Sequence, residues 1–180
     1  ILEQTEKLDF LIQSLVKLSR MESGIIAVHS EDTTIAQMFA SVQQQFNVKV
    51  REKNITLSLC DTDLHVRCDS KWTMEALGNI VDNAIKYTAC GGNVQIKVEQ
   101  YSFFVKIDII DDGIGIEKEE IPKIFGRFYR SLSVADQPGV GIGLFLAREI
   151  IQAQKGYIKV TSKRGKGSTF SVFLPIAKKE

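Results

Sequence analysis

Apolar residues in the first twenty positions recur at intervals of three, four and seven. Ile1, Leu8, Leu11, Leu15 and Leu18 form one stripe, and Glu, Gln and Lys fill most positions between them. This spacing predicts a helix with a coiled-coil-like seam. Because one helix cannot bury such a seam alone, we expect it to pack against a second helix or a second copy of the chain. The alternative is that it packs on its own globular domain.

After Ser23-Gly24, which is predicted to end that helix, apolar residues follow either the strand period of two or the helix period of 3.6. Helices are predicted over 35–50, 70–87 and 141–154, and strands over 25–28, 55–59, 66–68, 94–98, 103–110, 157–161 and 169–174. We expect Asp32-Thr33-Thr34 and Asp69-Ser70 to cap the first two helices. The fold class predicted is α+β, a two-layer sandwich in which helices cover one face of a single mixed sheet. The expected units are a helix over 1–22 and a domain over 23–180.

Composition narrows the classes of partner. The 180 residues carry 23 Lys and Arg against 22 Asp and Glu, so the basic field of a general nucleic-acid binder is missing. No apolar run is long enough to cross a bilayer, and no membrane contact is expected. Three scattered cysteines fit a reducing, cytoplasmic location, with a Cys60–Cys68 pair as the alternative. The chain lacks a starting Met and is expected to be a fragment.

The predicted helix over 70–87 carries a polar face that a hydrophobic core does not explain. Asn79, Asp82, Asn83, Lys86 and Tyr87 share one side at about 100° per residue. A solvated surface is the ordinary explanation, but Asn is a poor helix former, and two Asn one turn apart favour a polar site. Amide oxygens suit Mg²⁺, which takes substrate phosphates as further ligands.

Six of the thirteen glycines gather within the long loop predicted over 112–140 and the start of the next helix: Gly113, Gly115, Gly126, Gly139, Gly141 and Gly143. A long aperiodic stretch inside a compact domain is typical of a functional lid.

Two glycine clusters in this stretch suggest ligand contacts. Asp111 to Ile116 (DDGIGI) follows a strand, so its glycines admit a close ligand and its carboxylate can accept from an exocyclic amine. Gly139 to Leu144 (GVGIGL) leads into a helix whose free amides favour phosphate. Neither cluster matches the Rossmann or P-loop pattern.

Aromatic residues and arginines alternate between the two glycine clusters. Phe125 and Phe128 serve either as anchors of a small satellite core or as parts of the lid. The guanidinium groups of Arg127 and Arg130 suit phosphate oxygens.

The order and spacing of these motifs resemble the catalytic, ATP-binding domain of bacterial sensor histidine kinases, within the superfamily of gyrase, heat-shock chaperone and mismatch-repair ATPases. The resemblance spans nearly the whole chain and implies the Bergerat-type ATP-binding fold. Its motifs are the N box (79–88), the G1 box (111–115), the F box (125–130), the G2 box (139–144), a final Thr motif (167–170) and the end of a dimerisation helix (15–24, LVKLSRMESG).

The resemblance implies a role for each matching residue. Asn83, helped by Asn79, would ligate Mg²⁺, and Asn79, Lys86 and Arg130 would assist phosphoryl transfer. The residues implied to contact phosphates are Lys86, Arg130, Arg127, Gly139, Gly141, Gly143 and Leu144. Those implied at the adenine are Tyr87, Asp111, Gly113, Gly115 and, through water, Thr169.

Two departures from the family pattern shape the functional hypothesis. Asn79 stands where gyrase-like relatives carry a general-base Glu, so we expect slow hydrolysis of ATP and transfer of its γ-phosphoryl to another acceptor. The phosphoacceptor motif is absent, since His29 and His65 both lie off the seam helix.

The prediction is therefore a fragment of a sensor histidine kinase that uses Mg-ATP. In the full protein, with or without a membrane anchor, an upstream histidine would accept the phosphoryl group and pass it to a response-regulator aspartate. The seam helix would form a homodimer. The alternatives are an anti-sigma-factor-type Ser/Thr kinase and a non-catalytic nucleotide-binding module that docks a partner.

Overall fold

The computed structural model describes residues 28–131 and 139–176, together with Val134, Gln137 and four N-terminal positions, Ile12, Gln13, Val16 and Ser19. Those four positions have a helical backbone, and the side chains of Ile12 and Val16 are exposed. The seam leucines, the end of the predicted helix at Ser23-Gly24 and the domain boundary after residue 22 lie outside the described residues, so they stay predictions.

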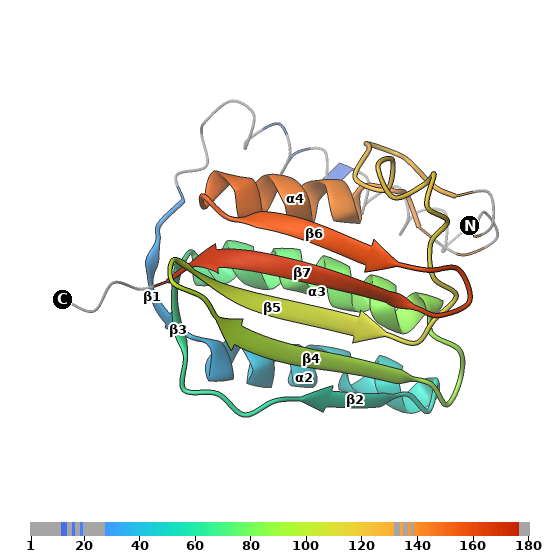
Figure 1. The fold of residues 1–180 in the computed structure, drawn as a ribbon, viewed down its shortest axis with the longest axis horizontal. Coiled ribbons are helices and arrows are strands. Elements are labelled where there is room, and N and C mark those ends of the chain that lie inside the picture. The colour runs from blue at the N-terminus through green and yellow to red at the C-terminus, as the bar shows by residue number, and fades with distance from the viewer. Residues whose placement is uncertain are drawn as a thin grey trace.

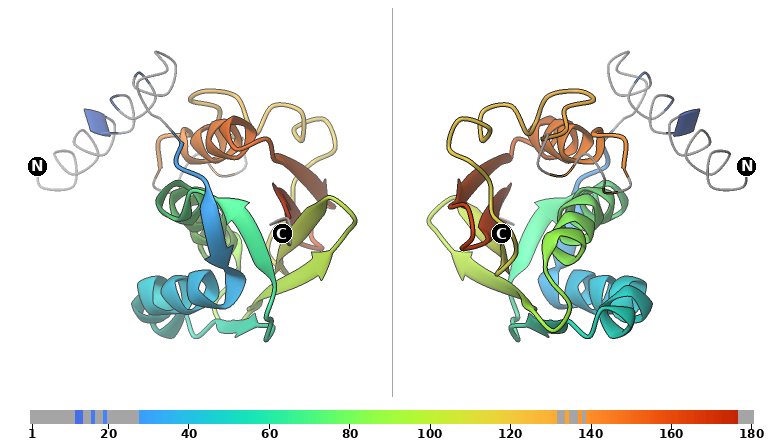
Figure 2. Two further views of the ribbon diagram at one scale, coloured as in Figure 1. Left: turned by 90° about the vertical axis from the view of Figure 1, so that its left-hand side faces the viewer. Right: turned by 90° about the vertical axis from the view of Figure 1, so that its right-hand side faces the viewer.

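The domain has two layers, a mixed five-stranded sheet and three helices on one of its faces (Figures 1 and 2). The strands lie in the order β2 (Thr56–Leu59), β4 (Asn93–Gln100), β5 (Phe104–Asp111), β7 (Ser168–Pro175) and β6 (Tyr157–Ser162). The β2–β4 pair is parallel and the other pairs are antiparallel. The helices are α2 (Ile35–Glu52), α3 (Ser70–Tyr87) and α4 (Gly143–Ala153). The predicted fold class is confirmed.

A second, two-stranded sheet was not predicted. It pairs β1 (Glu31–Thr34) with β3 (His65–Cys68) in antiparallel register. The sequence suggested a strand at 25–28, but Val28 has no strand structure, and the described strand begins three residues later. Thr34 ends β1 and is also the N-cap of α2, without a side-chain hydrogen bond. The position of the cap was therefore predicted, but its side-chain hydrogen bond does not form, and the pairing of this polar segment was not predicted.

Helix α3, which carries the polar face, begins and packs as its sequence predicts. The Asp69 side chain accepts a hydrogen bond from Trp72 N at 3.1 Å, which satisfies one of the free amides of the first turn. Leu77, Ile80, Val81 and Ala84 are buried against the sheet and α4. The polar side chains Asn79, Asp82, Asn83 and Lys86 on another side of α3 are only partly exposed.

A buried polar junction joins the start of α3 to the end of α4. Gln154 Oε1 accepts hydrogen bonds from Asp69 N at 2.6 Å and Thr73 Oγ1 at 3.2 Å. The Asp69 carboxylate also accepts from His29 N at 3.0 Å, so it binds the segment that leads into the domain. This junction fixes the two helices at the end of the sheet where β5 begins.

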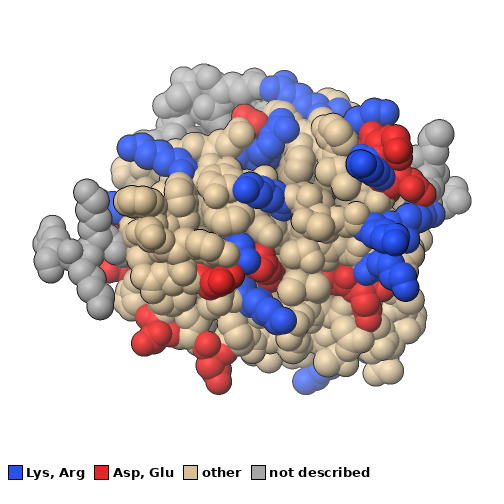
Figure 3. Space-filling model, in the orientation of Figure 1, with Lys and Arg blue, Asp and Glu red and all other residues tan. Residues whose placement is uncertain are grey.

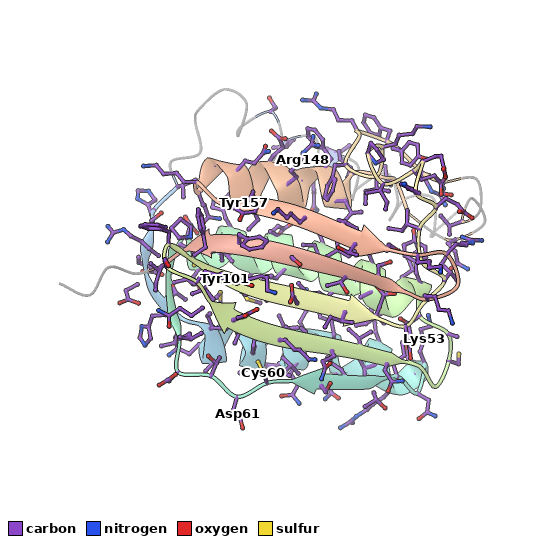
Figure 4. The ribbon with its side chains drawn as sticks, in the orientation of Figure 1. Lys53, Cys60, Asp61, Tyr101, Arg148 and Tyr157 are labelled. Atoms are coloured by element: carbon purple, nitrogen blue, oxygen red, sulfur yellow. The ribbon has the colours of Figure 1, made fainter. Side chains whose placement is uncertain are left out.

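The outer face of the sheet carries charges of both signs among uncharged residues (Figure 3). Lys106 Nζ pairs with Glu99 at 2.9 Å and with Asp108 at 3.0 Å. The ring of Tyr157, which is labelled in Figure 4, stacks on the ring of Phe173 with centroids 4.3 Å apart. Cys60, Cys68 and Cys90 are free thiols, so the alternative of a Cys60–Cys68 disulfide is wrong. Within the described residues, no helix has both the length and the apolar character to span a membrane.

Candidate functional site

Four elements end or begin at one edge of the domain, on the right in Figure 1. These are the end of α3, the end of β5, the start of β7 and the start of α4. The junction of Asp69 and Gln154 lies at the opposite end of the same helices. The long loop 112–140 also begins and ends at this edge, so the polar face of α3 and both glycine clusters meet here.

These elements enclose an open pocket with about 1180 Å³ of empty space, including space open to solvent. Most of the residues predicted to bind a ligand line it. They are Asn79, Asn83, Lys86, Tyr87, Asp111, Gly115, Arg130, Gly139, Gly141, Gly143 and Leu144.

Asp111 supplies the carboxylate of the pocket, at the end of β5. Its side chain is buried, with 7% exposed, and Oδ1 accepts hydrogen bonds from Gly113 N at 3.0 Å and Ser168 N at 3.2 Å. Burial raises the pKa of Asp111 to about 6, although both backbone donors act in the opposite direction. Since both of these donors bind Oδ1, Oδ2 is available to accept from a ligand amine.

Glycines pack the two loops around Asp111 against each other, backbone to backbone. A methyl group at Gly115 would lie 2.1 Å from Lys163 O, and one at Gly167 would lie 1.9 Å from Asp111 O. Gly165 N also donates to Ile114 O at 2.7 Å. No side chain fits between these strand ends, so main chain packs directly on main chain beside the carboxylate.

The polar face of α3 forms a second wall. Asn79 and Asn83 line the pocket one helical turn apart, and Asn79 Nδ2 is buried without a hydrogen-bond partner. Asp82 lines the pocket as well, but its Oδ1 lies 2.5 Å from Lys49 Nζ. An unsatisfied buried amide is costly, and it marks the place where a polar ligand would complete the site.

The start of α4 forms another end of the pocket. Its N-cap, Ile142, makes no side-chain hydrogen bond, and its first turn holds no acidic residue. The free amides and the positive end of the helix dipole therefore face the cavity. A methyl group at Gly143 would lie 3.1 Å from Asn79 Oδ1, so glycine allows α4 to approach α3 closely here.

Two cationic side chains complete this end. Lys86 Nζ lies 4.9 Å from the centroid of the Tyr87 ring, and burial together with Arg130 lowers the pKa of Lys86. The Arg130 guanidinium donates to Val134 O at 3.0 Å and also to Gln137 O. Both cations are thus held at the mouth of the pocket, with Arg130 bonded to its own loop.

Three residues predicted as ligand contacts do not line the pocket. Gly113 lies beneath it, and a methyl group there would be 2.5 Å from Tyr87 O. The Arg127 guanidinium stacks on the Phe145 ring at 4.7 Å. Thr169 pairs with Ile110, on the face of β7 opposite to Ser168 and Phe170, because successive side chains of a strand alternate.

The two phenylalanines of the loop differ in their surroundings. Arg148 of α4, labelled in Figure 4, lies 5.5 Å from the Phe125 ring centroid, so Phe125 anchors the loop on α4. Phe128 is 51% exposed, and its φ of 59° is unusual for a residue with a side chain. Phe125 thus fits the alternative of an anchor, and Phe128 does not.

Sequence reasoning missed several residues of the pocket. Ser168 contributes its backbone N–H to Asp111, and apolar side chains of the loop and β7 add the hydrophobic part of the lining: Ile114, Ile116, Ile124, Val140 and Phe170. Glu120, also in the lining, accepts a hydrogen bond from Tyr129 at 3.1 Å. A single apolar residue in a loop carries no periodic signal, and the alternation of β7 does not by itself show which of its residues reaches the pocket.

Comparison with known proteins gives consistent matches. Residues 68–178 match the family model described as histidine kinase-, DNA gyrase B-, and HSP90-like ATPase. The chain is 33% identical over 177 residues to the sensor histidine kinase WalK of Bacillus subtilis (strain 168), a match that covers 96% of this chain but only 29% of WalK.

Solved structures agree with that match. The Acinetobacter baumannii histidine kinase AdeS has a TM-score of 0.76 at 25% identity, covering 98% of this chain and 82% of that one. The mycobacterial sensor histidine kinase MprB has a TM-score of 0.73 at 25% identity, covering 82% of this chain and 98% of that one.

Proposed function

Since the chain belongs to the family of histidine kinase-, DNA gyrase B- and HSP90-like ATPases, we propose that it is the Mg-ATP-binding catalytic part of a sensor histidine kinase. In the whole protein, the bond between the γ-phosphorus and the bridging oxygen of ATP breaks, and a phosphorus–nitrogen bond forms on a histidine outside this sequence. ADP leaves, and a response-regulator aspartate accepts the phosphoryl group afterwards.

One observation carries the proposal, the convergence of complementary groups in one pocket. A buried carboxylate acceptor, Asp111, lies at one end, and the uncapped start of α4 with Lys86 lies at the other. An exocyclic amine and a polyphosphate at opposite ends of one ligand match these two ends, and ATP has both. Catalysis of phosphoryl transfer consists mostly of positioning and charge neutralisation, which such a site supplies.

The residues present also fit a magnesium ion. Asn79 and Asn83 offer amide oxygens on one face of α3. The unpartnered Nδ2 of Asn79 is a donor, so it would bind a phosphate oxygen or a water beside the ion rather than the ion itself. We assign these two amides as the protein ligands of Mg²⁺, with phosphate oxygens and water as the others. The bound ion would neutralise charge on the phosphates.

The carboxylates of the pocket favour transfer over hydrolysis. Position 79 is Asn, so its side chain cannot act as a general base toward water. Asp82 is paired with Lys49, and Glu120 accepts from Tyr129. Because these carboxylates are engaged and Asp111 lies at the adenine end, we expect slow ATP hydrolysis and a γ-phosphoryl group available to an oriented histidine.

Assembly and location extend the proposal to the whole protein. We propose that the N-terminal seam of Leu8, Leu11, Leu15 and Leu18 forms the helical interface of a homodimer, and that the site operates in the cytoplasm. The test is light scattering at several protein concentrations, in which a monomer throughout would contradict the dimer.

Phosphorylation of the full-length protein tests the catalytic proposal. With γ-labelled Mg-ATP we expect label that is stable in alkali and lost in acid, as phosphohistidine is, and no label in the Asn83→Ala variant. Acid-stable, alkali-labile label would instead support the Ser/Thr kinase alternative. Binding of an ATP analogue without any label would support the non-catalytic module.

A further inference from the structure

The carboxyl end of α3 has no glycine cap. Thr88 occupies the C-cap in an extended conformation, and its N–H donates to Ala84 O. The four carbonyl groups that follow, those of residues 85–88, have no partner within the helix and must be satisfied otherwise. This end carries Lys86 and Tyr87, so the way it is held affects the pocket directly.

One ammonium group satisfies three of the four carbonyls. Lys53 Nζ lies 2.8 Å from Ile85 O, 2.9 Å from Lys86 O and 2.7 Å from Thr88 O. An ammonium has three donors, so this arrangement uses its full capacity. A cation at this end also interacts favourably with the negative end of the helix dipole.

The fourth carbonyl binds the wall of the pocket. Tyr87 O accepts from Ile114 N at 3.2 Å, and Ile114 lines the cavity. Gly113 lies so close to Tyr87 O that a methyl group there would be 2.5 Å away. Tyr87 O, which binds the loop after β5, is thus flanked in the sequence by the three carbonyl groups that Lys53 Nζ binds.

Lys53 is itself fixed by the backbone. It is the C-cap of α2, its N–H donates to Lys49 O at 3.2 Å, and its carbonyl accepts from Gly91 N at 3.0 Å. Figure 4 labels it at the end of the molecule where the α3–β4 turn lies. Lys53 therefore joins the end of α2 to the last turn of α3 through its ammonium group, and to the α3–β4 turn through its carbonyl group.

We propose that Lys53 is a positioning residue for the nucleotide site. It holds the last turn of α3 in the geometry that presents Lys86 and Tyr87 to the ligand and that receives Ile114 N. Lys53 does not line the pocket, so its effect passes through these carbonyls. The inference rests on the proposed function in so far as the ligand is ATP.

Binding of a non-hydrolysable ATP analogue with Mg²⁺ to Lys53→Met tests this proposal. Methionine keeps much of the side-chain volume and removes all three donors. We expect affinity to fall about ten-fold, the size of effect that follows from losing roughly 1.4 kcal/mol of binding free energy. Lys53→Arg keeps donors at this place, and we expect it to restore most of the affinity.

Two controls separate positioning from general stability. Lys97→Met removes an exposed ammonium on β4, and we expect no change in affinity. Val42→Ala creates a cavity in the buried face of α2, away from the pocket, and supplies a destabilised variant that still binds normally while folded. Urea unfolding of each variant defines conditions in which all are folded.

Amide exchange supplies a local readout. In Lys53→Met we expect faster exchange of the Ile114 amide, and no such change in Val42→Ala. Normal affinity of Lys53→Met, or equal losses in Lys53→Met and an equally destabilised Val42→Ala, would overturn the inference. Failure of the wild-type chain to bind the analogue would overturn the proposed function instead, so the two failures are distinguishable.

Discussion

The substitution Asp111→Asn is predicted to stabilise the free protein while it removes nucleotide binding. Burial raises the pKa of this carboxyl from 3.8 to about 6, so at pH 7.5 the folded state bears the cost of an ionised buried group. At 1.36 kcal/mol per pKa unit, this cost is about 3 kcal/mol. The amide that replaces the carboxylate has no charge to bury, and its oxygen can still accept from Gly113 N and Ser168 N.

The sign of the pH dependence follows from the raised pKa. Above pH 6 the folded carboxyl is ionised and the whole cost is present. Between about pH 6 and pH 3.8 the folded state holds a proton that the unfolded chain has not yet bound, so wild-type stability rises toward that of the variant as pH falls. The difference narrows to about 1 kcal/mol at pH 4.5.

Ligand binding changes in the opposite direction. With its oxygen on the two backbone donors, the introduced amide turns its NH2 group toward the adenine amine, where the carboxylate of Asp111 would accept. The ligand loses a hydrogen bond to a charged acceptor, and the NH2 group of the side chain faces the amine of the adenine, so two donors meet without an acceptor. Together these changes cost about 3 kcal/mol of binding free energy, or more than a hundred-fold in affinity.

Urea unfolding at pH 7.5 and pH 4.5 measures the first effect, and calorimetry with a Mg²⁺-bound ATP analogue measures the second. A variant less stable than the wild type at pH 7.5, or a stability difference independent of pH, would refute the desolvation argument. Unchanged affinity would refute the assignment of Asp111 to the adenine.

Three further substitutions test other parts of the structure. Asn83→Ala is expected to abolish binding of the Mg-ATP analogue in calorimetry, and chelating the metal should weaken wild-type binding. Gly141→Ala is expected to weaken binding of the analogue at least ten-fold, because the φ of Gly141 is +77° and the new methyl group would lie 2.6 Å from Tyr129 O. The matched control is Gly91→Ala, where φ is +82° and nothing lies within 4 Å of the new methyl group. Asp69→Ala should lower unfolding free energy in urea by about 1–3 kcal/mol, since it removes a helix cap and a buried acceptor.

The helices and the antiparallel β4–β5 pair were predictable because their signals are local. The buried stripe of α2 repeats at helical spacing, and β4 alternates over consecutive residues. The β1–β3 pair depends on contacts such as that between Thr33 and Val66, which lie far apart in the sequence. Residues 31–34 are too polar and too few to indicate a strand without that partner.

The site was predictable where one short motif supplies its own geometry, as at Asp111 and at the glycines before α4. It was not predictable where strand register decides which residue faces the ligand. Asp111 lies opposite Ser168, and a shift of one residue would have placed Thr169 there instead. The same holds for Lys53, whose partners lie more than thirty positions away and are backbone atoms that no side-chain motif marks.

The backbone packing at Gly115 and Gly167 makes the two ends of the pocket thermodynamically unequal. Packed main chain has no rotamers to lose, so at the proposed base end only lining side chains such as Ile114 and Tyr87 would lose freedom when a ligand arrives. At the proposed phosphate end, Arg130 already donates to Val134 O and Gln137 O, so it would have to exchange these hydrogen bonds for those of a ligand. Net affinity is therefore expected to come disproportionately from the base, and ligands truncated at the phosphates should keep more binding free energy than their lost contacts suggest.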